Sequence, residues 1–319
     1  MPRLLVSSES KREREGGSAR RERLRPSAGS GDSGATAGVP GVLRSLGVRP
    51  SRRLGQNFLL DPRVADRIAA LVEDADVGVV EIGPGLGALT ERLARSGRPL
   101  AAVELDLRLA EEVERMLAAF PRARLVRGDI LEQRLEDLLP GDAPVVVVAN
   151  LPYSITTPAV EWVLAQGPRV RRAFLMVQRE VAERMTATPG GKEFGSLSVF
   201  LALHAEVKPL FRVSPGAFYP RPEVDSIIVS MTPRPFPGSS EVERAEAERI
   251  ARAATTGRRK TIANALARGL GLDGEAVRRW LTAAGVDPRR RGETLSVEEW
   301  LQMARVGLAS GAAPRRSAE

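Results

Sequence analysis

The chain has 319 residues, of which 43% are hydrophobic and 28% charged, a composition typical of folded proteins and a length sufficient for two domains. Cysteine is absent and His204 is the only histidine, so disulfides, thiolate catalysis and metal sites built from Cys or His are excluded. No apolar run approaches the roughly 18 residues of a membrane span, and the N-terminus lacks the apolar core of a secretory signal. We therefore expect a cytoplasmic protein with no membrane or metal partner.

Positive charge is concentrated in one part of the chain. Lys and Arg number 48 against 40 acids, giving a net charge of +8, and residues 251–291 hold ten Lys and Arg against three acids. The clustered cations of this stretch are Arg258, Arg259, Lys260, Arg289, Arg290 and Arg291. Because arginine suits phosphate, we expect these residues to bind RNA. The alternatives are a solvated surface and an arginine-rich genome.

The first 49 residues are rich in Arg, Gly and Ser and have almost no apolar periodicity, which predicts a disordered leader. At residues 61–62 an Asp precedes a Pro, a pattern that begins helices. Short apolar runs then alternate with amphipathic stretches such as residues 105–120. The runs are residues 77–82, 100–103, 124–126, 145–149, 173–177 and 227–231.

This alternation predicts an α/β domain over residues 50–232 with a Rossmann-like, mainly parallel sheet. Prolines cluster in residues 233–240 and predict a linker. Residues 241–306 show only helical periodicity, which predicts a small all-helical domain. The remaining residues, 307–319, are expected to form a flexible tail.

A glycine-rich turn follows the first apolar run of the sheet. Gly83 and Gly85 lie between that run and a helix over residues 89–95, so the backbone can approach a ligand closely. Glu104 ends the next strand, where a carboxylate can accept both hydroxyls of an adenosine ribose. This arrangement suits NAD and S-adenosylmethionine alike.

Two acidic residues distinguish these cofactors. Glu81, just before the turn, would repel the pyrophosphate of NAD and attract the ammonium of a methionine moiety. Asp129, after the third strand, can accept a hydrogen bond from an adenine amino group, although a helix N-cap is the alternative role. The sulfonium cofactor is therefore favoured.

Residues 145–149 end in Asn150, Leu151, Pro152 and Tyr153, at the sheet edge where ligands bind in open α/β folds. Amide and carbonyl oxygens followed by a flat ring suit an exocyclic aromatic amine. An ordinary turn with a core tyrosine is the alternative.

These motifs together resemble the ribosomal RNA adenine N6-dimethyltransferases, and the branch that acts on 16S rRNA more than the 23S rRNA resistance methylases. The resemblance extends from about residue 54 to residue 301. It rests on residues 54–59, 81–87, Glu104, Asp129, 150–153, 215–226 and 258–266.

The resemblance implies a class I S-adenosylmethionine-dependent methyltransferase that dimethylates N6 of two adjacent adenosines near the 3′ end of 16S rRNA in the 30S subunit, and that takes part in late subunit assembly. Asn57 and Leu59 would lie over the cofactor, with Gly83, Glu104, Asp129 and Asn150 lining the rest of its site. Phe218 would stack on the target base opposite Tyr153; a core phenylalanine is the alternative. We expect a monomer.

For the reaction, we expect the Asn150 side-chain oxygen and the Leu151 carbonyl to accept hydrogen bonds from the adenine amino group, so that no strong general base is needed. Three other functions stay open: a 23S rRNA methyltransferase, an assembly factor with dispensable catalysis and, more distantly, a nicotinamide dehydrogenase. The order of methylation and the role of the leader are not specified by the sequence.

Overall fold

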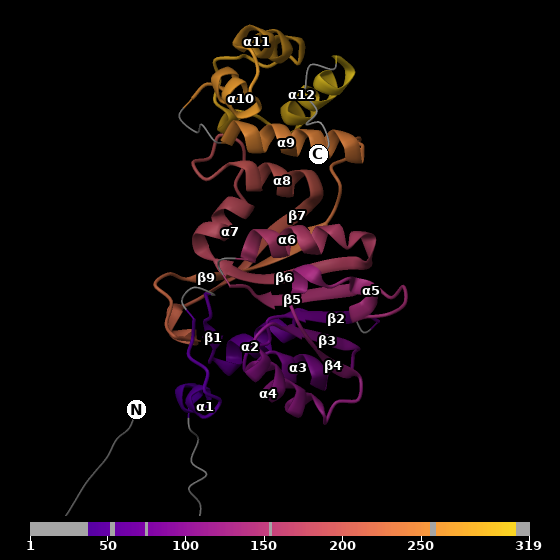
Figure 1. Ribbon diagram of the computed structural model, residues 1–319, viewed down its shortest axis with the longest axis vertical. Coiled ribbons are helices and arrows are strands. Elements are labelled where there is room, and N and C mark those ends of the chain that lie inside the picture. Colours follow the sequence, from indigo (N-terminus) through magenta and orange to yellow (C-terminus); the bar gives the residue numbers. More distant parts are fainter. Residues whose placement is uncertain (1–37, 52–54, 74–75, 153–154, 256–259, 311–319) are drawn as a thin grey trace, which may run out of the picture. The chain divides into compact units, whose positions relative to one another are not determined.

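The computed structural model describes residues 38–51, 55–73, 76–152, 155–255 and 260–310. In this part of the chain, seven strands form one sheet in the order β4-β3-β2-β5-β6-β9-β7 (Figure 1). The strands are β2 (Gly78–Ile82), β3 (Leu100–Glu104), β4 (Ala123–Arg127), β5 (Val145–Asn150), β6 (Val170–Gln178), β7 (Ala205–Val213) and β9 (Ser226–Pro233). From β4 to β6 neighbouring strands run parallel, whereas β9 runs antiparallel to β6 and β7. The predicted mainly parallel sheet is confirmed.

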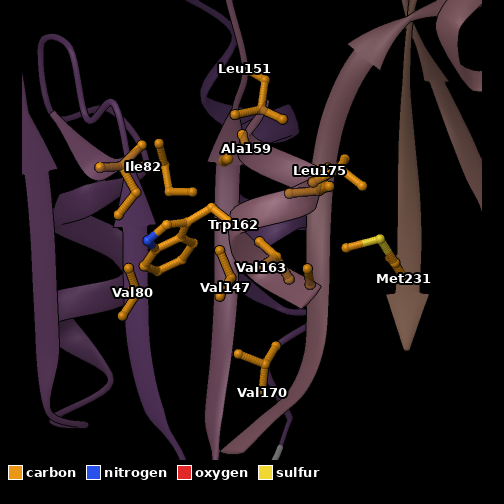
Figure 2. Packing of buried hydrophobic residues seen from close by; sticks show 14 of the residues in the cluster. Val80, Ile82, Val147, Leu151, Ala159, Trp162, Val163, Val170, Leu175 and Met231 are labelled. Carbon is orange, nitrogen blue, oxygen red and sulfur yellow. The ribbon is translucent and has the colours of Figure 1, made fainter. Parts of the chain in front are cut away.

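The central strands β2, β3 and β5 are short, rich in Val and Ala, and buried except at Asn150, the last residue of β5, as expected for strands covered on both faces. Helices α2 (Pro62–Ala69), α3 (Thr90–Arg95) and α4 (Leu107–Leu117) cover one face. Helices α5 (Leu135–Leu138), α6 (Thr156–Ala165), α7 (Arg179–Met185) and α8 (Ser196–His204) cover the other. Figure 2 shows Trp162 of α6 beside Val80 and Val147 of the sheet, and its indole N–H donates to the Gln133 carbonyl at 2.8 Å.

The edge strand β7 has no counterpart in the sequence-based prediction. Pro209 lies inside it, and the register shifts between Pro209 and Phe211. Proline has no amide hydrogen to donate and is therefore confined to edge strands or irregularities. The same proline obscures the strand pattern in the sequence.

The expectation of disorder up to residue 49 is wrong for its last part. Residues Val39–Ser45 form helix α1, with Pro40 in its first turn. Leu43 and Val48 are 2% and 3% exposed, and they pack with Phe58 and Leu109. Burial against the rest of the fold stabilises a helix too short to be stable alone. Residues 1–37 lie outside the described part of the chain.

The predicted helical region contains α9 (Glu241–Thr255), α10 (Ile262–Leu270), α11 (Gly274–Ala283) and α12 (Val297–Ser310). These helices share an apolar cluster that includes Trp280 and Trp300. Val199 and Leu203 of α8 also belong to it, so this core begins before the proline-rich linker (Figure 1). The flexible tail expected from residue 307 is wrong for residues 307–310, which continue α12.

None of the helices in the described residues is both long and apolar enough to cross a membrane.

Candidate functional site

A cavity of about 340 Å³ opens at the carboxyl ends of β2, β3 and β5, the edge of an open α/β sheet where ligands bind. Its size suits a small-molecule ligand. The structure brings the sequence-predicted site residues together in the cavity wall: Asn57, Leu59, Glu81, Gly83, Gly85, Glu104, Asp129, Asn150, Leu151, Pro152 and Phe218. Tyr153 lies outside the described residues.

The glycine turn after β2 forms one wall of the cavity. Gly83 and Gly85 have φ angles of +68° and +60°, a region that side chains other than glycine disfavour. A Cβ atom on Gly85 would also lie 3.2 Å from the Phe58 ring. Both the turn and the close approach of Phe58 therefore favour glycine at this position.

Glu104 is held in place by backbone donors. Its Oε2 accepts from the Gly85 N–H and its Oε1 from the Asp106 N–H, both at 3.0 Å. Each carboxylate oxygen has a second lone pair, so both can still accept from a ligand. Burial raises the pKa of Glu104, while the two backbone N–H groups counteract that rise.

Glu81 is more deeply buried, at 2% exposure. Its Oε2 has no hydrogen-bond partner among the described residues. Burial raises its pKa to about 8; the nearby Thr90 hydroxyl counteracts part of this rise, and the Glu104 carboxylate adds to it. A buried acceptor without a partner is costly, and a cationic ligand group in the cavity would satisfy it.

Asp129 has the helix N-cap role that was its expected alternative, and its contact with an adenine amino group stays a prediction. Its Oδ1 accepts from the Leu131 N–H at 2.9 Å and caps the short helix η1 (Ile130–Glu132). The residue also lines the cavity. The cap fixes the position of the carboxylate, and its second oxygen is available to a ligand.

The Asn150 side chain is oriented by the N-terminal segment. Its Nδ2 donates to the Asn57 carbonyl at 2.9 Å, which leaves the amide oxygen free to accept. The next residue, Leu151, is anchored by its N–H to the Met176 carbonyl at 3.2 Å. The end of β5 therefore presents acceptors at a fixed place in the cavity wall.

Phe218 belongs to both the cavity and the core. It lies in strand β8 (Phe218–Tyr219), which pairs antiparallel with β1 (Phe58–Leu59). It is 4% exposed and packs in the apolar cluster between the sheet and helices α2, α3 and α4. Phe218 therefore lies in the cavity wall and in the apolar core at once, and its stacking on a base stays a prediction.

Sequence reasoning missed several cavity residues, among them Phe58, Leu105, Ile130, Pro222 and Ser226. Leu105 follows Glu104 directly and is 57% exposed. An apolar residue immediately after the strand-ending acid is a signal that could have identified it. Phe58 lies in residues 54–59, one of the segments on which the resemblance rests, but its place in the cavity depends on pairing with Tyr219, much later in the chain.

The candidate RNA-binding residues have different surroundings. Lys260 is exposed, and the Arg289 side chain is 88% exposed beside Asp287. Arg291 lies 3.6 Å from Glu293. Arg290 instead binds both carboxylate oxygens of Glu299, so it holds its loop to α12. Arg258 and Arg259 lie outside the described residues.

Comparison with known proteins decides between the cofactor classes that the motifs allow. The family model for ribosomal RNA adenine dimethylase matches residues 48–307. The chain belongs to this family. It is an rRNA adenine dimethyltransferase that uses S-adenosylmethionine.

Individual relatives agree with this assignment. The chain is 43% identical to ribosomal RNA small subunit methyltransferase A of Geobacter metallireducens, over 84% of this chain and 99% of that protein. The protein of the same name from Moorella thermoacetica is 42% identical, over 86% and 98%.

Solved structures give the same fold. The 23S rRNA methyltransferase ErmE has a TM-score of 0.59 and 29% identity, and the match covers 78% of this chain and 99% of that one. A dimethyladenosine transferase from Plasmodium falciparum has a TM-score of 0.64 and 23% identity, with 80% and 98% covered.

The residues of the cavity fit S-adenosylmethionine. The Glu81 carboxylate oxygen that has no hydrogen-bond partner within the described part of the chain suits the ammonium of the methionine moiety, and the accessible lone pairs of Glu104 suit ribose hydroxyls. The glycine turn leaves room for close approach of the ligand, and Leu105 and Ile130 supply apolar walls.

Proposed function

We propose that this protein dimethylates N6 of two adjacent adenosines near the 3′ end of 16S rRNA, within the small ribosomal subunit. The observation that carries the proposal is the alignment with small-subunit enzymes over 99% of their length at 43% identity, combined with the fixed acceptor of Asn150 in the cavity wall. The 23S rRNA enzyme matches at a lower identity of 29%.

The chain's own residues would hold and orient the two reactants. Bound S-adenosylmethionine supplies an electrophilic methyl group. Glu81 would hold the ammonium at the methionine end of the cofactor, Glu104 the ribose hydroxyls in its middle, and Asp129 the amino group of the adenine at its other end. Positioning of donor and acceptor can supply a large part of the rate enhancement without a general base.

The target amine would be held by the end of β5. Its two N–H groups would donate to the Asn150 Oδ1 and the Leu151 carbonyl, which draws the nitrogen lone pair out of conjugation with the ring. Phe218 would stack on the extruded base, an interaction worth roughly 1–3 kcal/mol per base. Dimethylation further requires that the monomethylated amine rotate within the cavity and react again.

Methylation assays test the proposal. Purified protein would be incubated with labelled S-adenosylmethionine and either 30S or 50S subunits from a strain lacking the modification, followed by mass spectrometry of the nucleosides. We expect dimethyladenosine in the 3′ region of 16S rRNA at two equivalents per 30S subunit. Incorporation only into 50S subunits would assign the protein to the 23S rRNA branch instead.

A cytoplasmic location, a monomeric state and a part in late subunit assembly belong to the same proposal. Sedimentation equilibrium tests the monomeric state.

The role in assembly is tested with Asn150→Ala. We expect this variant to lose most methyl transfer and to bind 30S subunits with an affinity within about threefold of wild type. Ribosome profiles of a deletion strain complemented with Asn150→Ala then separate an assembly role from catalysis.

A further inference from the structure

Ser226 is a buried polar residue of the cavity wall that the proposed chemistry leaves without a role. It is the first residue of β9, is 4% exposed and lines the cavity. Its hydroxyl makes no hydrogen bond with any residue that the structure describes. A buried hydroxyl without a partner is costly, and a ligand with a hydrogen-bond acceptor would remove that cost.

We propose that the Ser226 hydroxyl recognises the target adenine by donating a hydrogen bond to one of the two ring nitrogens that flank the amino group, N1 and N7. The inference rests on the proposed function and adds a specificity-determining residue to it. Asn150 and Leu151 would hold the amino group, and Ser226 would fix how the ring is turned about it.

The register of the sheet places Ser226 on the same face as Asn150. Asn150 pairs with Met176 of β6, and Gln178, two residues later in that strand, pairs with Ser226. Side chains of paired residues point to the same face of a sheet, as do those of residues two apart in one strand. Asn150, Met176 and Ser226 all line the cavity. Two polar side chains therefore face the cavity with an apolar one between them.

The spacing of the strands fits a base between these two polar groups. β5, β6 and β9 are consecutive strands of the sheet (Figure 1). Because neighbouring strands are about 4.8 Å apart, Asn150 and Ser226 lie about 10 Å apart across the sheet. Their side chains, with a hydrogen-bonded purine ring between them, can span that distance.

Ser226 is fixed by its surroundings. Its backbone is paired with β6 on one side and with β7 on the other. The preceding residue, Asp225, forms an ion pair with Arg212 at 2.7 Å, and its carbonyl accepts from the Arg179 N–H at 2.9 Å. A hydroxyl on such a backbone loses little conformational freedom when it binds a ligand, which favours its use in recognition.

The same segment of the chain carries the expected stacking residue. Phe218, Pro222 and Ser226 all line the cavity, so the connection from β8 to β9 begins and ends in its wall. Phe218 would contact the flat face of the base and Ser226 its edge. Stacking tolerates every base, whereas a hydroxyl that donates to a ring nitrogen requires an acceptor at that edge.

The first test compares kcat/KM for unmethylated 30S subunits among single variants that a thermal melt shows to be folded. We expect Ser226→Ala to lower kcat/KM by about 5- to 20-fold, in the range of one lost hydrogen bond, and to bind S-adenosylhomocysteine within about twofold of wild type. Ser226→Cys keeps the shape of the side chain but has a weaker donor, so it should show most of the same loss.

Ser230→Ala is the matched control for these variants. Ser230 lies in the same strand and on the same face, four residues further along and outside the cavity wall. The control should keep wild-type kcat/KM.

The second test identifies the atom that Ser226 contacts. Reconstituted 30S subunits would carry a synthetic 3′ segment of 16S rRNA in which the target adenosines are replaced by 1-deazaadenosine or by 7-deazaadenosine. We expect wild type to lose at least about fivefold in kcat/KM on one of the two analogues. Ser226→Ala should lose less than about twofold on that analogue, because its hydrogen bond to the ring nitrogen is already absent.

Three results would overturn the inference: wild-type kcat/KM in Ser226→Ala or Ser226→Cys, less than fivefold loss by wild type on both analogues, or an equal loss on them by wild type and Ser226→Ala. These results are distinct from failure of the proposed function, which shows as absent methylation of 30S subunits by wild type. In that event the same variants and analogues are tested with the RNA that wild type does methylate.

Discussion

Truncation of Glu104 tests how the cavity holds its cofactor. Glu104→Ala removes the acceptor of two backbone N–H groups, from Gly85 and Asp106, and any bond to the ribose. Each buried donor left without a partner costs about 1–3 kcal/mol, so the variant should also melt at a lower temperature. Loss of charge-assisted bonds to the ribose should weaken S-adenosylmethionine binding by about 1.5–3 kcal/mol, or roughly 10- to 150-fold.

Isothermal titration calorimetry of wild type, Glu104→Ala and Glu104→Gln measures this effect below the melting temperature of each protein. The glutamine side chain keeps one acceptor oxygen without the charge, so its affinity should lie between the other two. Glu132→Ala is the control, because Glu132 is an exposed acid near the same sheet edge and outside the cavity wall. Affinity of the folded Glu104→Ala protein within twofold of wild type would refute the assignment of Glu104 to the ribose.

Three further predictions concern other parts of the site. Because the pKa of Glu81 is raised from 4.5 to about 8, its contribution to stability is present below pH 4.5 and lost as the pH rises toward 8. Chemical denaturation of the cofactor-free protein should show this loss in the free energy of unfolding between pH 6 and 8, and Glu81→Gln should remove it. If the free energy of unfolding falls equally steeply with pH in both proteins, Glu81 does not have the raised pKa. Phe218→Tyr should keep methylation, whereas Phe218→Ala should lose at least about tenfold in kcat, because stacking needs a flat face. Near-normal turnover by a thermally destabilised Phe218→Ala would instead assign this residue to the core alone. Replacing both Lys260 and Arg289 by Ala should lower the salt slope of 30S binding by about 0.7–0.9 per lost phosphate contact at unchanged cofactor affinity. Arg122→Ala is the control variant, because Arg122 is exposed and directly precedes β4. If the double variant keeps the wild-type salt slope, Lys260 and Arg289 are excluded from the RNA contact.

The sequence determined the sheet and much of the cavity wall. Strands such as β5 are continuous apolar runs, and parallel strands place their carboxyl ends at one edge. Three predicted site residues lie in the last two positions of their strands, and one follows its strand closely: Glu81, Glu104, Asn150 and Asp129. Their order along the chain was therefore enough to assign them to one site, and all four line the cavity.

Tertiary structure decided the features that depend on contacts between distant segments. Helix α1 is stabilised by burial of Leu43 against Phe58 and Leu109, and no local pattern in an Arg-, Gly- and Ser-rich stretch predicts that burial. Strand β7 is stabilised by its pairing with β9 despite Pro209. The orientation of the Asn150 amide likewise depends on the carbonyl of Asn57, 93 residues earlier in the chain. Local propensity and spacing specify which residues lie at the carboxyl ends of the strands. Packing and strand pairing between distant segments specify which other groups those residues contact.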